Sequence, residues 1–212
     1  MDADRLEAYR TRLRADPAGA LKDCGVPPAY LSARMADFDG KPVPPMERPH
    51  LLAEYGLFIT GDAGTGKTHL ATAGLAELLP GLVTADKFGI PHGPDALWTA
   101  APQVLQELRA TFNGRGESEI DVTKRYTRPA LLVLDDLGAE QATDWTGQAL
   151  YLLLSTRVNH LRPTIITSNL SLQALDARDP RLASRLGGMA YQRLTGEDRR
   201  VVRAGELGGR AP

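Results

Sequence analysis

Gly61-Asp62-Ala63-Gly64-Thr65-Gly66-Lys67-Thr68 is the stretch that decides the fold of this 212-residue chain. It has the form G-x-x-x-x-G-K-[ST], in which glycines let the backbone approach phosphates and successive N–H groups form an anion nest at a helix N-terminus. The lysine then reaches the β- and γ-phosphates, and the threonine hydroxyl binds Mg²⁺. An apolar strand pattern precedes the motif and a helical pattern follows it. We therefore expect the loop, together with His69, to bind ATP, and Thr68 to bind Mg²⁺.

A second motif comes 70 residues after Gly61, in Leu131-Leu132-Val133-Leu134-Asp135-Asp136. A buried apolar strand that ends in two acids is typical of a Walker B site. We expect Asp135 to lie beside Mg²⁺ and Asp136 to orient or deprotonate the attacking water. A solvated turn suits the same Asp-Asp-Leu-Gly letters. Glu140 is a lesser candidate for the base.

Two further patterns carry chemistry. In Thr167-Ser168-Asn169 the amide at a strand tip can reach the γ-phosphate or the lytic water, although a helix N-cap is the alternative, and Ser171 is the better cap. The segment from residue 178 to 210 contains eight arginines and only four acidic residues. A solvated basic face, an arginine finger and a contact to a nucleic-acid backbone all remain open for this run.

Short apolar runs alternate with helical periodicity from residue 55 onward, which predicts an α/β fold with a parallel sheet and crossover helices. The expected strands are Gly56–Thr60, Ala96–Thr99, Ala130–Asp135, Thr164–Thr167 and Met189–Leu194. Leu82–Ala85 competes with the second of them, and residues 86–95 read as a loop. The expected buried helix faces are Leu70, Leu75, Leu78 and Leu79; Val104, Leu105, Leu108 and Phe112; and Leu150, Leu153, Leu154, Val158 and Leu161.

The N-terminal region reads differently. Residues 2–15 predict an amphipathic helix with Leu6, Tyr9 and Leu13 on one face. The proline-rich stretch that starts at Pro27 reads as an extended lead-in rather than a core element. We therefore divide the chain into an N-terminal helix and lead-in (1–50) and a core (51–212).

Composition excludes several classes of protein. The chain is 42% hydrophobic and 24% charged with a net charge of −1, so it is not dominated by disorder. No run approaches the roughly 20 apolar residues of a membrane span, and the charged N-terminus does not look like a signal peptide. One cysteine, Cys24, excludes an internal disulfide, and four scattered histidines predict no transition metal. A cytoplasmic location and no membrane partner are expected.

Six segments in this order resemble the DnaC/IstB family of AAA+ ATPases, which comprises bacterial and phage replicative-helicase loaders and insertion-sequence transposition ATPases. They are GDAGTGKTHLA (61–71), LWTAAPQVLQELRATF (97–112), LLVLDDLGAEQATDW (131–145), RPTIITSNLSLQAL (162–175), PRLASRL (180–186) and GEDRR (196–200). The resemblance covers roughly residues 26–203. It implies a three-layer AAA+ sandwich around a five-stranded parallel sheet. Since 18 residues follow Leu194, we expect no helical lid domain.

The resemblance also implies residue roles. Asn169 matches sensor 1, Arg185 matches the arginine finger that completes a neighbour's ATP site, and Arg200 (or Arg199) matches sensor 2. The helix at 102–112 matches a part of the family's core that contributes to single-stranded DNA binding, and for Arg109 on it a solvated charge is the alternative. Helicase loaders often carry a separate helicase-binding domain. Here the helix at 2–15 is one candidate contact, unless its apolar face packs on its own domain.

The leading hypothesis is an ATPase that assembles as an open spiral or ring on single-stranded DNA and loads a hexameric replicative helicase. The nearest alternative is a transposition helper that binds duplex DNA and a transposase. A small-molecule kinase and a nucleotide switch without turnover are rivals from other classes. Asp136 is one methylene shorter than the Glu that the resemblance leads us to expect, so slow hydrolysis, stimulated by DNA or a partner, fits the sequence.

Overall fold

The computed structural model describes residues 3–38, 56–85, 90–114 and 116–196. Its helices are α1 (Ala3–Ala15), α2 (Ala18–Asp23), α5 (Lys67–Leu78), α6 (Ala101–Ala110), α7 (Glu119–Thr127), α8 (Asp144–Asn159), α9 (Leu172–Arg178) and α10 (Pro180–Leu186). Its strands are β1 (Leu57–Gly61), β2 (Val83–Ala85), β3 (Pro91–Pro94), β4 (Ala96–Ala100), β5 (Leu131–Leu137), β6 (Thr164–Ser168) and β7 (Ala190–Leu194). Short 3₁₀ turns lie at Pro28–Tyr30, Met35–Phe38, Leu79–Leu82 and Thr111–Asn113.

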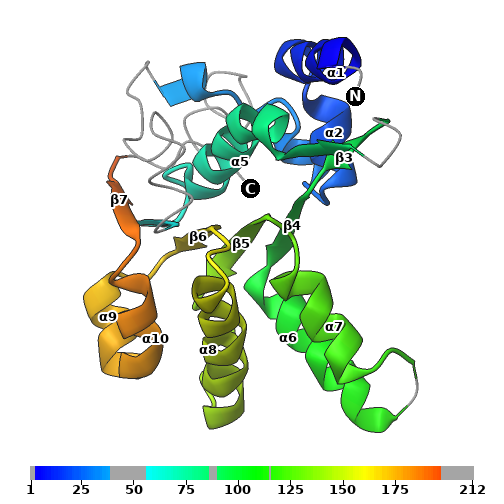
Figure 1. Cartoon of the computed structure of the whole chain (residues 1–212). Coiled ribbons are helices and arrows are strands. Elements are labelled where there is room, and N and C mark those ends of the chain that lie inside the picture. The colour runs from blue at the N-terminus through cyan, green and yellow to red at the C-terminus, as the bar shows by residue number, and fades with distance from the viewer. Residues whose placement is uncertain (1–2, 39–55, 86–89, 115, 197–212) are drawn as a thin grey trace, which may run out of the picture.

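The central sheet has five parallel strands in the order β4-β5-β6-β1-β7 (Figure 1). All five expected strands are confirmed, with ends shifted by one or two residues. Strand β6 lies between β1 and β5. Because the strands are parallel, the loop after β1 and the polar ends of β5 and β6 meet at one edge of the sheet. This order brings together three motifs that are far apart in the sequence.

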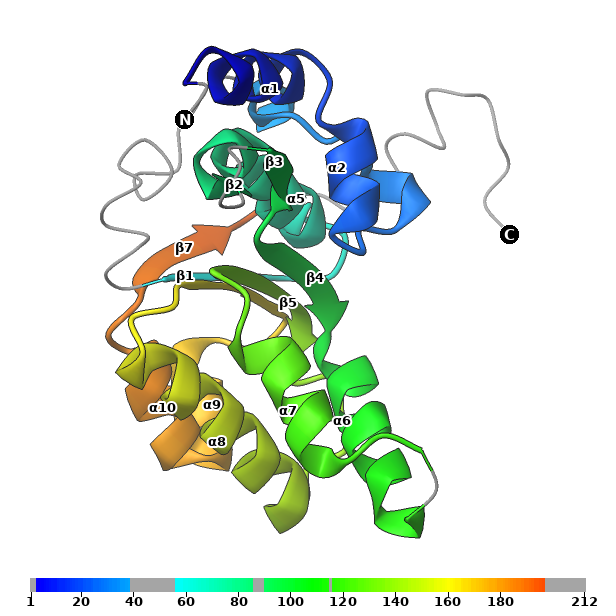
Figure 2. The same ribbon diagram turned by 45° about the vertical axis from the view of Figure 1, so that its right-hand side comes forward.

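Alternate residues of each strand face two different cores, as Figure 2 shows by the helices above and below the sheet. Leu57 and Ile59 pack towards α5 and the N-terminal helices. Phe58 between them packs towards α6–α10. Because both faces are covered, the strands read as continuous apolar runs. The predicted three-layer sandwich is confirmed.

The N-terminal region packs in the same core as α5, on one face of the central sheet. Leu13 of α1 is buried, and Leu6 and Tyr9 pack against the same cluster. The apolar face of the predicted first helix therefore packs on its own domain. In the described part of this helix, Leu6, Tyr9 and Leu13 are thus engaged within the chain rather than presented to a partner's groove.

The lead-in interpretation is wrong for residues 27–38, because Ala33 and Phe38 are buried core residues. The segment before them covers the free edge of the sheet: the backbone N–H of Trp98 in β4 donates to the carbonyl of Cys24 at 2.7 Å. Covering an edge strand in this way protects it from pairing with another chain. Residues 39–50 of the proposed N-terminal unit lie outside the described residues.

Several details differ from the sequence-based prediction. Residues 91–94, expected in a loop, form β3, which pairs antiparallel with β2 in a separate two-stranded sheet. Helix α7 was not predicted at all. Phe112 is 61% exposed because it follows the end of α6, and Leu161 is 77% exposed because it follows the end of α8. Val158 is also exposed. Within the described residues, no helix is long and apolar enough to cross a membrane.

Arg157 of α8 is fully buried and connects α8 to the segments before β5 and β6 by hydrogen bonds. Its guanidinium donates to the carbonyls of Tyr126 (3.1 Å), Pro129 (2.9 Å) and Pro163 (2.7 Å), and to the hydroxyl of Thr164 (2.9 Å). These groups lie at the end of α7 and at the entries to β5 and β6. Burial lowers the pKa of Arg157 to about 9. Because this value is still above neutral pH, the side chain stays charged there.

We expect Arg157→Met to destabilise the fold strongly. Each buried carbonyl that loses its donor costs about 1–3 kcal/mol, so the free energy of unfolding should fall by roughly 3 kcal/mol or more. Arg162→Met is the matched control, because Arg162 donates to the carbonyl of Thr127 at a partly buried site. Urea denaturation measures both variants. Equal, small losses in the two would contradict this role for Arg157.

Candidate nucleotide site

The phosphate loop connects β1 directly to the first turn of α5. Gly66 precedes Lys67 with φ of +96°, a left-handed conformation that favours glycine. Gly61 is required for a second reason: a Cβ there would lie 2.2 Å from the carbonyl oxygen of Leu194 in β7. Lys67 Nζ and Thr65 Oγ1 both donate to the Asp62 carbonyl, at 2.7 and 2.8 Å. The loop therefore presents a lysine and a helix N-terminus together, as phosphate binding requires.

Two oxygen ligands suitable for Mg²⁺ lie side by side. Thr68 Oγ1 donates to Asp135 Oδ2 at 3.2 Å, which joins the first turn of α5 to the end of β5. A hydroxyl and a carboxylate beside the phosphate loop fit a hard cation that completes its shell with phosphate oxygens and water. Burial raises the pKa of Asp135, while hydrogen bonds from Thr167 and Thr68 oppose that shift. Elsewhere in the described part of the chain, no group of three or more His, Cys, Asp and Glu side chains could hold a metal.

The two acids of β5 lie in a β-bulge. Leu134 pairs with Ile166 and Leu137 with Ser168, so Asp135 and Asp136 together oppose the single residue Thr167. A bulge turns side chains that would otherwise point to opposite faces, and bulges are common beside active sites.

Thr167 binds both acids across that bulge. Its hydroxyl donates to Asp135 Oδ1 at 2.6 Å and accepts the backbone N–H of Asp136 at 2.9 Å. Sequence reasoning assigned a role to Asn169 and none to Thr167. The available signal was its place two residues before that asparagine, but a buried threonine in a strand also looks like ordinary core.

Asp136 and Asn169 meet at the ends of β5 and β6. Asn169 Nδ2 donates to Asp136 Oδ1 at 3.4 Å. Asp136 has φ of +61°, a left-handed conformation that costs a non-glycine residue about 1–3 kcal/mol. Ser171 is the N-cap of α9 and accepts from the Ala174 N–H at 3.1 Å, so the cap alternative does not apply to Asn169. The pair is placed to orient one water between a carboxylate and an amide.

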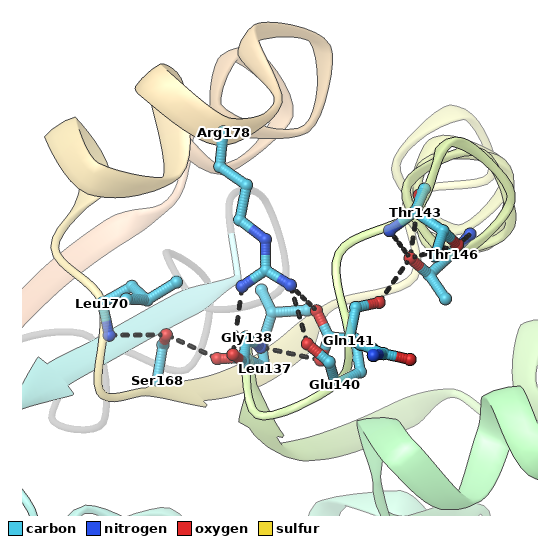
Figure 3. A network of polar contacts seen from close by, with 9 residues as sticks. All are labelled: Leu137, Gly138, Glu140, Gln141, Thr143, Thr146, Ser168, Leu170 and Arg178. Carbon is cyan, nitrogen blue, oxygen red and sulfur yellow. Dashed lines mark hydrogen bonds and ion pairs between the residues drawn. The ribbon is translucent and has the colours of Figure 1, made fainter.

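The other acid considered for the base is engaged differently. Glu140 Oε2 accepts the backbone N–H of Gly138 at 2.9 Å, and Glu140 Oε1 lies 3.6 Å from Arg178 Nη2 (Figure 3). Its carboxylate is therefore held within its own loop, whereas the Asp136 carboxylate contacts Asn169. A hollow of about 280 Å³ lies between this loop, α8 and the α9–α10 pair, and no phosphate-loop residue lines it.

His69, the last residue expected at the nucleotide, turns its side chain to the N-terminal segment. Its Nε2 lies 2.6 Å from Asp37 Oδ2, and its ring centroid lies 5.7 Å from that of Phe38. The hydrogen bond from His69 lowers the pKa of Asp37. The nucleotide contact expected of His69 stays a prediction.

The arginines predicted to act on the γ-phosphate are only partly described. Arg185 of α10 donates to the Tyr151 hydroxyl at 3.4 Å. Arg185 and Asp179, the alternative ion pair, are not within salt-bridge distance of each other, and Asp179 Oδ1 lies 3.5 Å from Arg181 Nε. Arg199 and Arg200 lie outside the described residues. The guanidinium of Arg109 lies 4.8 Å above the Trp145 ring.

The parallel sheet, the phosphate loop and the polar strand ends that meet it define an ATP-binding AAA+ domain. Residues 52–187 match the family described as IstB-like ATP binding protein, and the chain belongs to that family. This result confirms the resemblance to the DnaC/IstB family that the sequence motifs indicated.

Similar proteins come from both branches of the family. The replicative helicase loader DnaC of Escherichia coli K12 is 25% identical over 116 residues (55% of this chain, 43% of DnaC). The loader DnaI of Bacillus subtilis is 29% identical over 161 residues (68% and 47%). Rv3427c of Mycobacterium tuberculosis is described as an ATP-binding protein in an insertion sequence. It is 30% identical over 113 residues (53% of this chain and 40% of Rv3427c). The chain spans less than half the length of these relatives.

Solved structures agree with the fold. A crystal structure of DnaI matches with a TM-score of 0.63 and 25% identity over 82% of this chain and 93% of that one. A crystal structure of the DnaC helicase loader matches with a TM-score of 0.58 and 24% identity over 80% of this chain and 100% of that one. The second likeness is one of fold alone.

We expect Asp136→Asn to preserve ATP binding and to lower hydrolysis by about 100-fold or more, because the amide keeps the shape of the side chain and loses its basicity. A fluorescent ATP analogue measures binding, and phosphate release measures turnover. Unchanged turnover in Asp136→Asn, with a larger loss in Glu140→Gln, would assign the base to Glu140 instead.

Proposed function

We propose that this chain is an ATP-hydrolysing helicase loader that assembles on single-stranded DNA and helps to load a hexameric replicative helicase. The observation that carries the ATPase proposal is the Asp136–Asn169 pair beside Thr68 and Asp135, an arrangement suited to activating water. The named functions of DnaC and DnaI support the loader assignment. The helicase itself is the partner that these relatives indicate.

The chain's own residues account for each step of hydrolysis. The loop N–H groups and Lys67 hold the phosphates of ATP. Thr68 and Asp135 would hold Mg²⁺, which neutralises charge on the β- and γ-phosphates when bound. Asp136 accepts the proton of the attacking water while Asn169 orients that water. Arg200 is proposed to contact the γ-phosphate.

An exposed aromatic group favours single-stranded DNA over duplex. Phe112 is 61% exposed and packs edge-to-face on Trp145 at 5.6 Å, and Arg109 lies over the same indole. A flat aromatic surface with an adjacent cation can stack an unpaired base, which a duplex keeps inside its own stack. The two candidate functions share the nucleotide site, and this aromatic surface supports the loader over the transposition helper.

We expect Phe112→Ala to weaken binding of single-stranded oligonucleotides by roughly 10-fold, since stacking on an aromatic side chain contributes about 1–3 kcal/mol per base. Leu161→Ala, which removes an exposed apolar side chain after α8, is the control. Gel shifts at two salt concentrations with single and duplex DNA measure the effect, and affinity should fall with the logarithm of salt. A preference for duplex, unaffected by Phe112→Ala, would favour the transposition helper.

Arg185 is proposed to act on the ATP of a neighbouring copy in an open spiral or ring. In the single chain, its guanidinium contacts Tyr151 and forms no ion pair with Asp179. A partly exposed guanidinium without a carboxylate partner among the described residues is suited to a phosphate on another molecule. Head-to-tail contacts of this kind produce rings or open helical assemblies.

Mixing two inactive variants tests this arrangement. Arg185→Ala keeps its own phosphate loop, and Lys67→Ala keeps its arginine, so a mixed assembly contains complete sites. ATP turnover should return on mixing and should rise more than linearly with the concentration of the wild-type chain. An arginine finger contributes about 10³–10⁵ in rate, so the recovery is measurable. If mixing restores nothing and wild-type specific activity is independent of concentration, Arg185 does not act in trans.

A further inference from the structure

The loop that follows the Walker B acids is held from three directions (Figure 3). Ser168 of β6 donates its hydroxyl to the Leu137 carbonyl at 2.6 Å. Thr146 of α8 donates to the Gln141 carbonyl at 3.0 Å. Between these two contacts, the loop is held by Arg178, the last residue of α9.

Arg178 makes three contacts with this loop. Its Nη1 donates to the Gly138 carbonyl at 3.1 Å, and its Nη2 donates to the Glu140 carbonyl at 2.7 Å. The Glu140 carboxylate lies 3.6 Å from the same Nη2 and accepts the Gly138 N–H. The Arg178–Glu140 clamp, as we call it, closes the turn from both sides with one planar guanidinium, which a single ammonium cannot do.

The clamp lies next to two residues with positive φ, of which Asp136 is not a glycine. Asp136 has φ of +61°, and Gly138, two residues on, has φ of +93°. A Cβ on Gly138 would lie 2.7 Å from Leu170 Cδ1, so the loop contacts the residue that follows Asn169. In a residue other than glycine, such as Asp136, a left-handed conformation persists only where the surrounding contacts enforce it. The loop therefore adjoins both members of the Asp136–Asn169 pair: it follows Asp136 in the chain and contacts the residue after Asn169.

We propose that Arg178 is a positioning residue for ATP hydrolysis, which fixes Asp136 and Asn169 through the clamp; the proposal rests on the proposed ATPase function. A competing explanation exists. Arg178 also ends the helix that leads, through Asp179, into α10 with Arg185. On that view Arg178 would act only by holding the arginine finger for the neighbouring copy.

The first experiment compares Arg178→Met, Arg178→Lys and Arg125→Met. Arg125 of α7 is the matched control, because it forms surface ion pairs with Glu107 of α6 and with Glu117, which precedes α7. Affinity for a fluorescent ATP analogue should stay within about twofold in all three. Both Arg178 variants should lose about 10- to 100-fold in kcat, the size expected for a small misplacement of reacting groups. Arg125→Met should keep the wild-type kcat.

A double variant tests the clamp itself. Glu140→Gln should also lower kcat, and Arg178→Met combined with Glu140→Gln should be little worse than Arg178→Met alone, because both changes break one unit. Additive losses would overturn the clamp. If Arg178→Met has a lowered melting temperature, Glu140→Gln, which keeps the shape of the side chain, provides the measurement of kcat.

Mixing separates the two explanations. Arg178→Met mixed with Lys67→Ala should show no more turnover than Arg178→Met alone, because its own site carries the misplaced Asp136. Arg185→Ala mixed with Lys67→Ala is the positive control. Recovery by Arg178→Met would overturn the proposal and assign the effect to the arginine finger. A wild-type chain that binds ATP without turnover would remove the proposed function, whereas wild-type turnover unchanged in Arg178→Met would overturn the positioning role alone.

Discussion

The hydroxyl of Thr167 connects the parts on which the nucleotide site depends. It donates to Asp135, which accepts from Thr68 at the start of α5, and it accepts the main chain of Asp136. One buried hydroxyl thereby joins the first turn of α5 to both acids of the bulge. A threonine can do this only because β6 lies between β1 and β5 in the sheet. The strand order, which no local pattern encodes, is therefore the constraint that makes three distant motifs one site.

Much of this arrangement could be predicted from local chemistry. The phosphate loop, the apolar run before Asp135 and the polar tip at Asn169 each carry a strong pattern, and the parallel sheet follows from strands that alternate with helices. The sequence could not show which strand residues face which of the two cores, because a strand that is covered on both faces has no alternation of apolar and polar residues.

The features that were missed depend on contacts between distant segments. Prolines around residue 27 suggested an extended segment, yet Ala33 and Phe38 are buried against α5 and the sheet. Strand β3 has the sequence PHGP, which has little intrinsic strand preference and is paired only because β2 lies beside it. Nothing in the sequence distinguishes Arg157 from the other arginines, because its role depends on carbonyls that three separate segments bring together.

The backbone conformation of Asp136 gives a reason for an aspartate, rather than a glutamate, at this position. The family resemblance led us to expect Glu at this position, but φ of +61° favours Asp and Asn, whose short polar side chains tolerate the left-handed region. The bulge that turns both acids towards Thr167 therefore favours the shorter carboxylate. A shorter carboxylate reaches less far towards the water, which leaves the alignment of Asn169 and of the loop after Asp136 to make up the difference. The slow turnover expected from the sequence and the proposed role of the Arg178–Glu140 clamp would then share an origin in the geometry of one residue.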